Sequence, residues 1–348
     1  MWPLYKEPGD CGGQLRLPHA VTASNAETRY GVTETDDRGR GATSPEGIPL
    51  KGWWDILWRV YGKVNDDRVM LISAGVTFYL LLAVFPALTA FVSVYGFFGN
   101  PQTIYDHSAF LVGVLPHDAL TLIQGQLEGL VRQTNDLLSF SFVFGFSVAL
   151  WSANNGVKAL FDGMNVAYQE YEKRSFFRLN LISLTFTLGA IFLGTFFLIA
   201  LGVVPAVLAY ANLSSWTEML VRLARWPILF LVVVTGITLM YRFGPSREKA
   251  KWQWLTWGAV IATVVWIIAS LGFSYYIENF ADYNATYGTL GAVIGLMTWT
   301  WISVMIIIVG AEINAEAEHQ TEEDSTTGHP KPMGERGAVV ADTIGKSA

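Results

Sequence analysis

Three carboxylates and one amide follow directly after a long uncharged stretch near the end of the chain. No residue from 288 to 311 is charged, and the polar residues that come next are Glu312, Asn314, Glu316 and Glu318. An ionisable group at membrane depth is a functional candidate by default. One interpretation is that Glu312 faces an inward cavity and pairs with Arg242 or Arg247. The other is that the helix simply continues into the cytoplasm, where its carboxylates are solvated.

Four further residues form the candidate lining of a path through the membrane. Pro86 lies in the middle of an apolar stretch and should free the carbonyl of Leu82, which kinks a helix. Tyr79 lies about two turns earlier on the same stretch. Asn154 and Asn155 end another apolar stretch, and such amides are expected to face protein or water rather than lipid. We therefore expect a cavity between these two stretches and the last one.

A polar and aromatic segment, residues 283–288, joins the last two apolar stretches. Asn284, Thr286 and Tyr287 could line a substrate mouth there, because amide and phenol groups both donate and accept hydrogen bonds. The same segment is equally consistent with a tight turn, since Asn tolerates unusual backbone angles and Gly288 can start the next helix. Both interpretations stay open.

Residues that could hold a metal or perform catalysis are scattered along the chain. The single cysteine, Cys11, excludes an intramolecular disulfide and a cysteine zinc site. The five histidines form no His-x-His-x-Asp-His run of the kind that a zinc nuclease needs. No Gly-rich Lys-Ser/Thr loop for nucleotide phosphates occurs either. We expect no enzyme, no metal and no cofactor, and any driving force would be a gradient or a partner.

Long apolar helices must position these residues. Hydrophobic residues make up 52% of the 348-residue chain and charged residues only 15%, against about 25% in a soluble domain. At ~1.5 Å per residue, a helix of about 20 apolar residues crosses the ~30 Å hydrocarbon core of a bilayer. Six such stretches predict an all-α, polytopic integral membrane protein, with spans at about 69–98, 137–158, 179–204, 226–243, 253–277 and 288–311.

The remaining segments are predicted from composition and periodicity. Residues 1–50 contain few large apolar residues, so we expect a disordered cytoplasmic arm, and we expect the same of 322–348. In residues 52–67 apolar side chains recur at helical spacing among basic ones, which predicts an amphipathic helix on an anionic leaflet. Residues 100–136 predict amphipathic helices at the outer interface. The membrane domain then covers 51–321.

Lysine and arginine gather on one side of the predicted membrane domain. Four precede the first span, four lie between the second and third spans, and four lie between the fourth and fifth. The other side carries only Arg132, Arg222 and Arg225. Because positive residues favour the cytoplasmic side, both termini are expected in the cytoplasm.

Six segments resemble, in order and spacing, the YihY/virulence factor BrkB family of bacterial inner-membrane proteins. They are residues 74–88, 149–154, 165–168, 241–245, 283–294 and 310–316. The resemblance covers about residues 55–321. It implies a six-span inner-membrane protein. Members once carried the label ribonuclease BN, and the roles suggested for them are envelope integrity, serum resistance and lipid or solute transport.

Taken together, the sequence favours transport or translocation of an amphipathic envelope component, lipid or small solute. Membrane lipids are the expected partners, a homo-oligomer is compatible with this interpretation, and no nucleic acid is expected because the net charge is −6. Glu316, Arg242 and Arg247 are the candidate members of charge pairs. The alternative is a structural membrane protein that maintains the envelope. It predicts a well-packed interior and tolerance of Glu312→Gln.

Overall fold

A computed structural model describes residues 36–98, 135–198, 215–279 and 290–347, and within these ranges every named element is a helix. The only strand-like pairing in these ranges is an isolated bridge between Ala250 and Thr326. Five of the described helices are long and apolar enough to cross a membrane. The all-helical membrane architecture predicted from the sequence is thereby confirmed.

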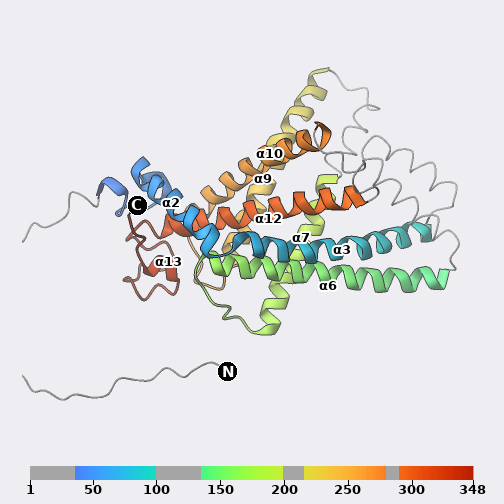
Figure 1. The fold of residues 1–348 in the computed structure, drawn as a ribbon, viewed down its shortest axis with the longest axis horizontal. Coiled ribbons are helices and arrows are strands. Elements are labelled where there is room, and N and C mark those ends of the chain that lie inside the picture. The colour runs from blue at the N-terminus through green and yellow to red at the C-terminus, as the bar shows by residue number, and fades with distance from the viewer. Residues whose placement is uncertain (1–35, 99–134, 199–214, 280–289, 348) are drawn as a thin grey trace, which may run out of the picture.

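Two antiparallel helices run side by side along one flank of the molecule (Figure 1). They are α3, Val69–Phe98, and α6, Asn135–Ala167. Glycines let them approach closely: a Cβ added at Gly145 would lie 3.0 Å from the carbonyl oxygen of Pro86. At Gly156 it would lie 3.2 Å from the side chain of Leu80. Small residues at a helix contact allow this packing in a membrane.

Helix α12, Gly291–Glu318, runs through the middle of the bundle (Figure 1). It packs against α3, α6 and α10, Trp252–Asn279. From Gly310 to Glu318 every residue of α12 is buried. The two further apolar helices are α7, Phe176–Leu198, and α9, Ser215–Phe243.

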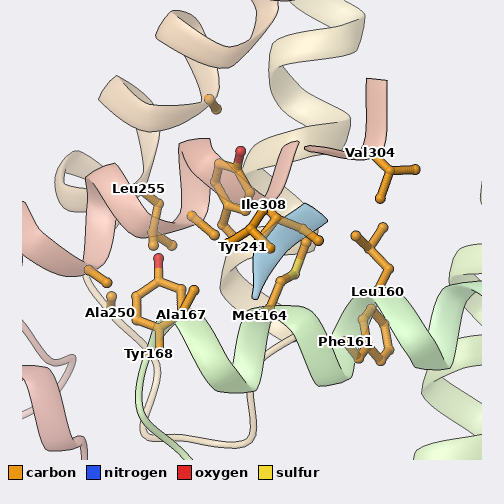
Figure 2. Packing of buried hydrophobic residues seen from close by; sticks show 14 of the residues in the cluster. Leu160, Phe161, Met164, Ala167, Tyr168, Tyr241, Ala250, Leu255, Val304 and Ile308 are labelled. Carbon is orange, nitrogen blue, oxygen red and sulfur yellow. The ribbon is translucent and has the colours of Figure 1, made fainter. Parts of the chain in front are cut away.

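The core joins α6, α9, α10 and α12 near one end of the bundle. Its largest fully buried side chains include Tyr168, Tyr241 and Phe161. Figure 2 shows this cluster, in which Tyr168 lies at the end of α6 beside Ala250 and Leu255. The hydroxyl of Tyr241 donates to the carbonyl of Ile307 on α12 at 2.7 Å. This bond ties α9 to the middle of α12.

The span predicted at 137–158 lies on α6, but the helix continues to Ala167. The continuation has a physical cause, because Leu160, Phe161 and Met164 are buried in the shared core. Helix α6 is not among the five helices that meet the span criteria within the described residues. The prediction of a sixth span therefore stays a prediction.

Helix α2, Leu50–Asp66, has two different faces. Gly52, Asp55, Ile56 and Val60 are buried against the bundle. The opposite face exposes large apolar and aromatic side chains, namely Leu50, Trp54, Leu57, Trp58 and Tyr61. That this face meets lipid stays a prediction.

The ends of the chain differ from the prediction of disorder wherever the structure describes them. Residues 36–50 form two short helical turns, η1, Asp36–Arg38, and η2, Pro45–Gly47. Residues 322–347 fold back and include α13, Val339–Asp342, which lies at the same end as α2 (Figure 1). The prediction of disorder is wrong for these two segments. Residues 1–35, like most of the predicted outer segment 100–136, lie outside the described residues.

The folded tail is held by polar bonds as well as by the buried Val340, which belongs to the core cluster. Arg336 is 5% exposed. Its guanidinium donates to the carbonyls of Glu322, Glu323, Lys331 and Ala341 at 2.6–3.2 Å. The prediction of disorder rested on the small number of apolar side chains in this segment. It could not anticipate that one buried arginine bonds four backbone carbonyls of the segment.

Candidate functional site

The polar end of α12 is enclosed by protein on all sides. Glu312, Asn314, Glu316 and Glu318 are at most 2% exposed. Because successive residues of an α-helix turn by about 100°, Glu312 and Glu316 share one face and the other two share the opposite face. The helix does continue through these residues to Glu318, but their side chains are packed in protein and not exposed to solvent.

Asn314 joins α12 to α10. Its Nδ2 donates to the carbonyl of Leu255 at 3.0 Å, and its Oδ1 accepts from the backbone N–H of Gly258 at 2.8 Å. The side chain is buried and uses both its donor and its acceptor in this contact. Its role in the structure is to lock two neighbouring helices.

Glu318 forms a buried ion pair with Arg247, which lies in the loop between α9 and α10. The two guanidinium nitrogens of Arg247 lie 2.7 and 3.1 Å from the two carboxylate oxygens. Ser325 Oγ donates to the same carboxylate at 2.6 Å. Burial by itself lowers the pKa of Arg247, but the charge of Glu318 outweighs it, so the pKa is raised. The guanidinium also lies 4.8 Å from the ring centre of Tyr168.

Glu316 pairs with Arg59 of α2. The Nε of Arg59 donates to the carboxylate at 2.5 Å, and an Nη donates to the backbone carbonyl of Glu316 at 3.1 Å. The same guanidinium reaches the Gln320 side chain at 2.8 Å. Glu316 thus pairs with a base from α2, not with Arg242 or Arg247.

Glu312 has no hydrogen-bond partner within the described residues. Both of its carboxylate oxygens are buried and unbonded. The predicted pairing with Arg247 or Arg242 is wrong. Arg247 binds Glu318, and Arg242 donates to the carbonyl of Ala250 at 2.5 Å while lying 4.2 Å from the ring centre of Trp252. The reason is the helical face, since Glu312 points toward α2 and away from the loop that carries these arginines.

A second group of buried polar atoms lies on α6. Ser152 Oγ and Asn154 Oδ1 are buried without a hydrogen-bond partner in the described chain. Asn155 is half-buried. On α3, Tyr79 is half-buried and lies beside Gly156 of α6, where a Cβ added to the glycine would be 3.5 Å from the tyrosine Cβ. The structure therefore brings Tyr79 close to the α6 segment that carries Asn154.

The remaining predicted path residues fall in two groups. Pro86 is half-buried inside α3, which continues through it, and its carbonyl faces α6. Asn284, Thr286 and Tyr287 lie outside the described residues. The choice between a substrate mouth and a tight turn thus stays open.

Sequence reasoning missed a polar network that fixes the connection after α6. Arg174 donates to the carbonyls of Phe243 and Gly244 at the end of α9, at 3.0 and 2.7 Å. It also binds Glu172 at 2.6 and 2.8 Å. Burial raises the pKa of Glu172, but its bonds with Arg174 lower the pKa to about 2. The sequence offered no local signal for this contact, because Arg174 lies 69 and 70 positions from Phe243 and Gly244.

A family model described as virulence factor BrkB matches residues 60–334, which is most of the chain. The chain belongs to the BrkB virulence-factor family. The match reaches beyond residue 321, so the family region of this BrkB protein includes Asp324 and Ser325 of the folded tail.

Several curated proteins are similar to this BrkB protein. A ribonuclease-like protein, YfkH, of Bacillus subtilis is 33% identical over 256 residues, which cover 70% of this chain and 88% of YfkH. A UPF0761 membrane protein of Vibrio cholerae is 26% identical over 282 residues, covering 79% and 92% of the two chains. One of Vibrio vulnificus is 25% identical over 264 residues, covering 74% and 81%.

No solved structure is significantly similar to this BrkB protein. The name of YfkH mentions a ribonuclease, whereas the names of the Vibrio relatives mention only a membrane protein. In the described ranges of this chain, no group of three or more His, Cys, Asp or Glu side chains is placed to hold a metal ion. The geometry described above gives no positive support for catalysis.

Proposed function

We propose that this BrkB-family protein transports or translocates an amphipathic envelope component, lipid or small solute. The observation that carries the proposal is the pair of buried, unbonded polar atoms on α6, Ser152 Oγ and Asn154 Oδ1. Leaving such an atom unbonded costs about 1–3 kcal/mol, so each one needs an explanation. Water or a polar group of a passing substrate would supply the missing bonds.

These atoms lie at membrane depth if α6 crosses the bilayer with α3. The two helices are packed together from Gly145 beside Pro86 to Gly163 beside Ile72. Helix α3 is long and apolar enough to cross a membrane. Because α6 is packed along α3 over this length, α6 crosses the same bilayer. We therefore count α6 as the sixth span.

The proposed location is the bacterial inner membrane with both termini in the cytoplasm. The basic residues Arg59, Arg174 and Arg247 all lie at the end of the bundle where α12 finishes. Positive residues concentrate on the cytoplasmic side of membrane proteins. The exposed aromatic face of α2 at this end would then rest in the cytoplasmic headgroup region, where tryptophan and tyrosine are favoured.

The competing function is a structural protein that maintains the envelope. One observation favours it: segments from both ends of the chain are bonded across the cytoplasmic end. Arg40 donates to the carbonyl of Gly345 at 2.6 Å, and Glu322 N–H donates to the carbonyl of Arg40 at 2.8 Å. Such bonds hold this end of the bundle closed, as expected of a protein whose role is structural.

Replacing the unbonded amide by an apolar side chain separates the two functions. Asn154→Leu would be expressed in a strain that lacks the native gene, and resistance to detergent or serum would be measured. Transport predicts loss of resistance, because the polar lining is gone. The control is Ser147→Ala, since Ser147 is exposed and bonds only to the Val143 carbonyl of its own helix.

The structural alternative predicts the reverse outcome. Removing an unbonded buried polar atom from a dry core is neutral or stabilising. If Asn154→Leu restores full resistance and also raises the melting temperature, the transport proposal fails.

A further inference from the structure

Three carboxyl groups, those of Asp67, Glu312 and Glu316, lie at the face between α2 and α12. Two of them have basic partners: Glu316 lies 2.5 Å from Arg59 and 3.5 Å from His319, and Asp67 lies 3.4 Å from Lys63. One carboxyl group, that of Glu312, is left over.

The leftover carboxyl group is also the most enclosed of the three. Glu312 is 0% exposed, whereas the side chain of Asp67 is 17% exposed. The apolar residues Val69, Ala311 and Ala315 belong to the buried cluster at this level of the bundle. An ionised carboxylate without a partner in such surroundings costs several kcal/mol, and the neutral acid avoids most of that cost.

The ionisable groups around Glu312 come from three parts of the chain. Lys63 and Asp67 at the end of α2 interact with it electrostatically, as does Glu316 on α12 itself. Tyr168 beyond the end of α6 also interacts with it. On α3, the nearby Ser73 donates to its own helix, to the carbonyl of Val69 at 2.8 Å.

Two of these neighbours are themselves incompletely bonded. The hydroxyl of Tyr168 and Oδ2 of Asp67 are buried without a hydrogen-bond partner in the described residues. Oδ2 of Asp67 is nevertheless the atom nearest to Lys63 in their ion pair. Glu312, Tyr168 and Asp67 thus each have a polar atom without a hydrogen-bond partner in the described residues. Of the three, only Asp67 reaches the surface.

We propose that Glu312 is a proton-binding site, which holds its proton in the resting state and exchanges it with solvent by way of Asp67. The proposal does not depend on what the protein transports. A proton suits the site better than a metal cation. Lys63 already places a positive charge nearby, and no cluster of metal-binding side chains occurs in the described ranges.

Infrared difference spectroscopy on the full-length protein in lipid vesicles tests the proposal. A protonated carboxyl group has a carbonyl stretch that an ionised one lacks. We expect this band at neutral pH in the wild type, loss of the band in Glu312→Gln, and retention in the matched control Glu335→Gln, whose residue is exposed. An unchanged band in Glu312→Gln would overturn the proposal.

Three further measurements keep the test decisive. Glutamine mimics the neutral acid, so Glu312→Gln should keep the wild-type melting temperature, and a large loss of stability would mean that the site holds a charge. Asp67→Asn should slow the appearance of the band after a pH jump without abolishing it. A band that shifts with sodium concentration at constant pH would assign the site to a cation and contradict the proton. None of these outcomes depends on Asn154, so this proposal and the transport proposal can fail separately.

Discussion

At the scale of single residues, the polar end of α12 shows how much depends on which face a side chain occupies. The sequence identified Glu312, Asn314 and Glu316 as unusual because they follow an uncharged stretch. It could not assign their partners. Arg59 lies 257 positions from Glu316 along the chain, and only the packing of α2 against α12 brings the two together.

The Glu172–Arg174 pair gives a pH-dependent prediction. Because the pKa of Glu172 falls to about 2 in the folded protein, below the ~4.3 of an unperturbed glutamate, ionised Glu172 stabilises the fold. This contribution is complete above about pH 4.3 and is lost as the pH falls toward 2. Melting temperatures in detergent, recorded between these pH values, should fall more steeply for the wild type than for Glu172→Gln.

The matched control for this series is Asp66→Asn, which changes an exposed carboxyl at the end of α2. Its pH profile should follow that of the wild type. Equal slopes for the wild type and Glu172→Gln would show that the pair with Arg174 does not stabilise the folded protein.

At the scale of elements, the sequence predicted the apolar helices well and their contacts poorly. Gly295 and Gly310 both lie on α12, and their residue type alone does not tell which one marks a close helix crossing. In the structure, a Cβ on Gly295 would lie 3.6 Å from Ile277, which is an ordinary contact. The tight crossing of α10 and α12 occurs instead at Gly258 and Gly310, because Asn314 draws the two backbones together there.

Gly258→Ala should therefore destabilise the protein strongly. The new methyl group would overlap the carbonyl oxygen of Gly310 and the side chain of Asn314, neither of which can move without breaking the α10–α12 contact. Gly272→Ala on the same helix meets nothing within 4 Å and should be neutral or slightly stabilising. The two variants would be compared by melting temperature and by yield in detergent. Equal behaviour would contradict the described crossing.

At the scale of the whole molecule, helix content and membrane location followed from composition, whereas the folded ends did not. The described residues 36–50 and 322–347 are rich in polar side chains, which led to a prediction of disorder. Arg40 bonds the carbonyls of Gln320 and Gly345, which lie 280 and 305 positions away, and Arg336 bonds carbonyls within its own tail segment, such as those of Glu322 and Ala341. Bonds between residues as far apart as Arg40 and Gly345 leave no local signal in a sequence.

Arg336→Ala should loosen the tail without unfolding the helical bundle. The variant loses four bonds to backbone carbonyls, so residues 322–347 should become accessible to protease. Limited proteolysis followed by mass spectrometry would locate the cuts. The exposed Lys346 offers a control, since Lys346→Ala keeps these bonds. Equal protection of the tail in Arg336→Ala and the wild type would show that Arg336 does not hold it.

The central claim is a water-accessible path beside α6, and thiol accessibility tests it most directly. In a Cys11→Ser background, Asn154→Cys would be exposed to a membrane-impermeant thiol reagent from each side of the membrane. Trp151→Cys, on the exposed side of the same helix, serves as the control. The account predicts labelling of Asn154→Cys and protection of Trp151→Cys. Protection of both positions from both sides would mean a dry bundle and would contradict transport through this path.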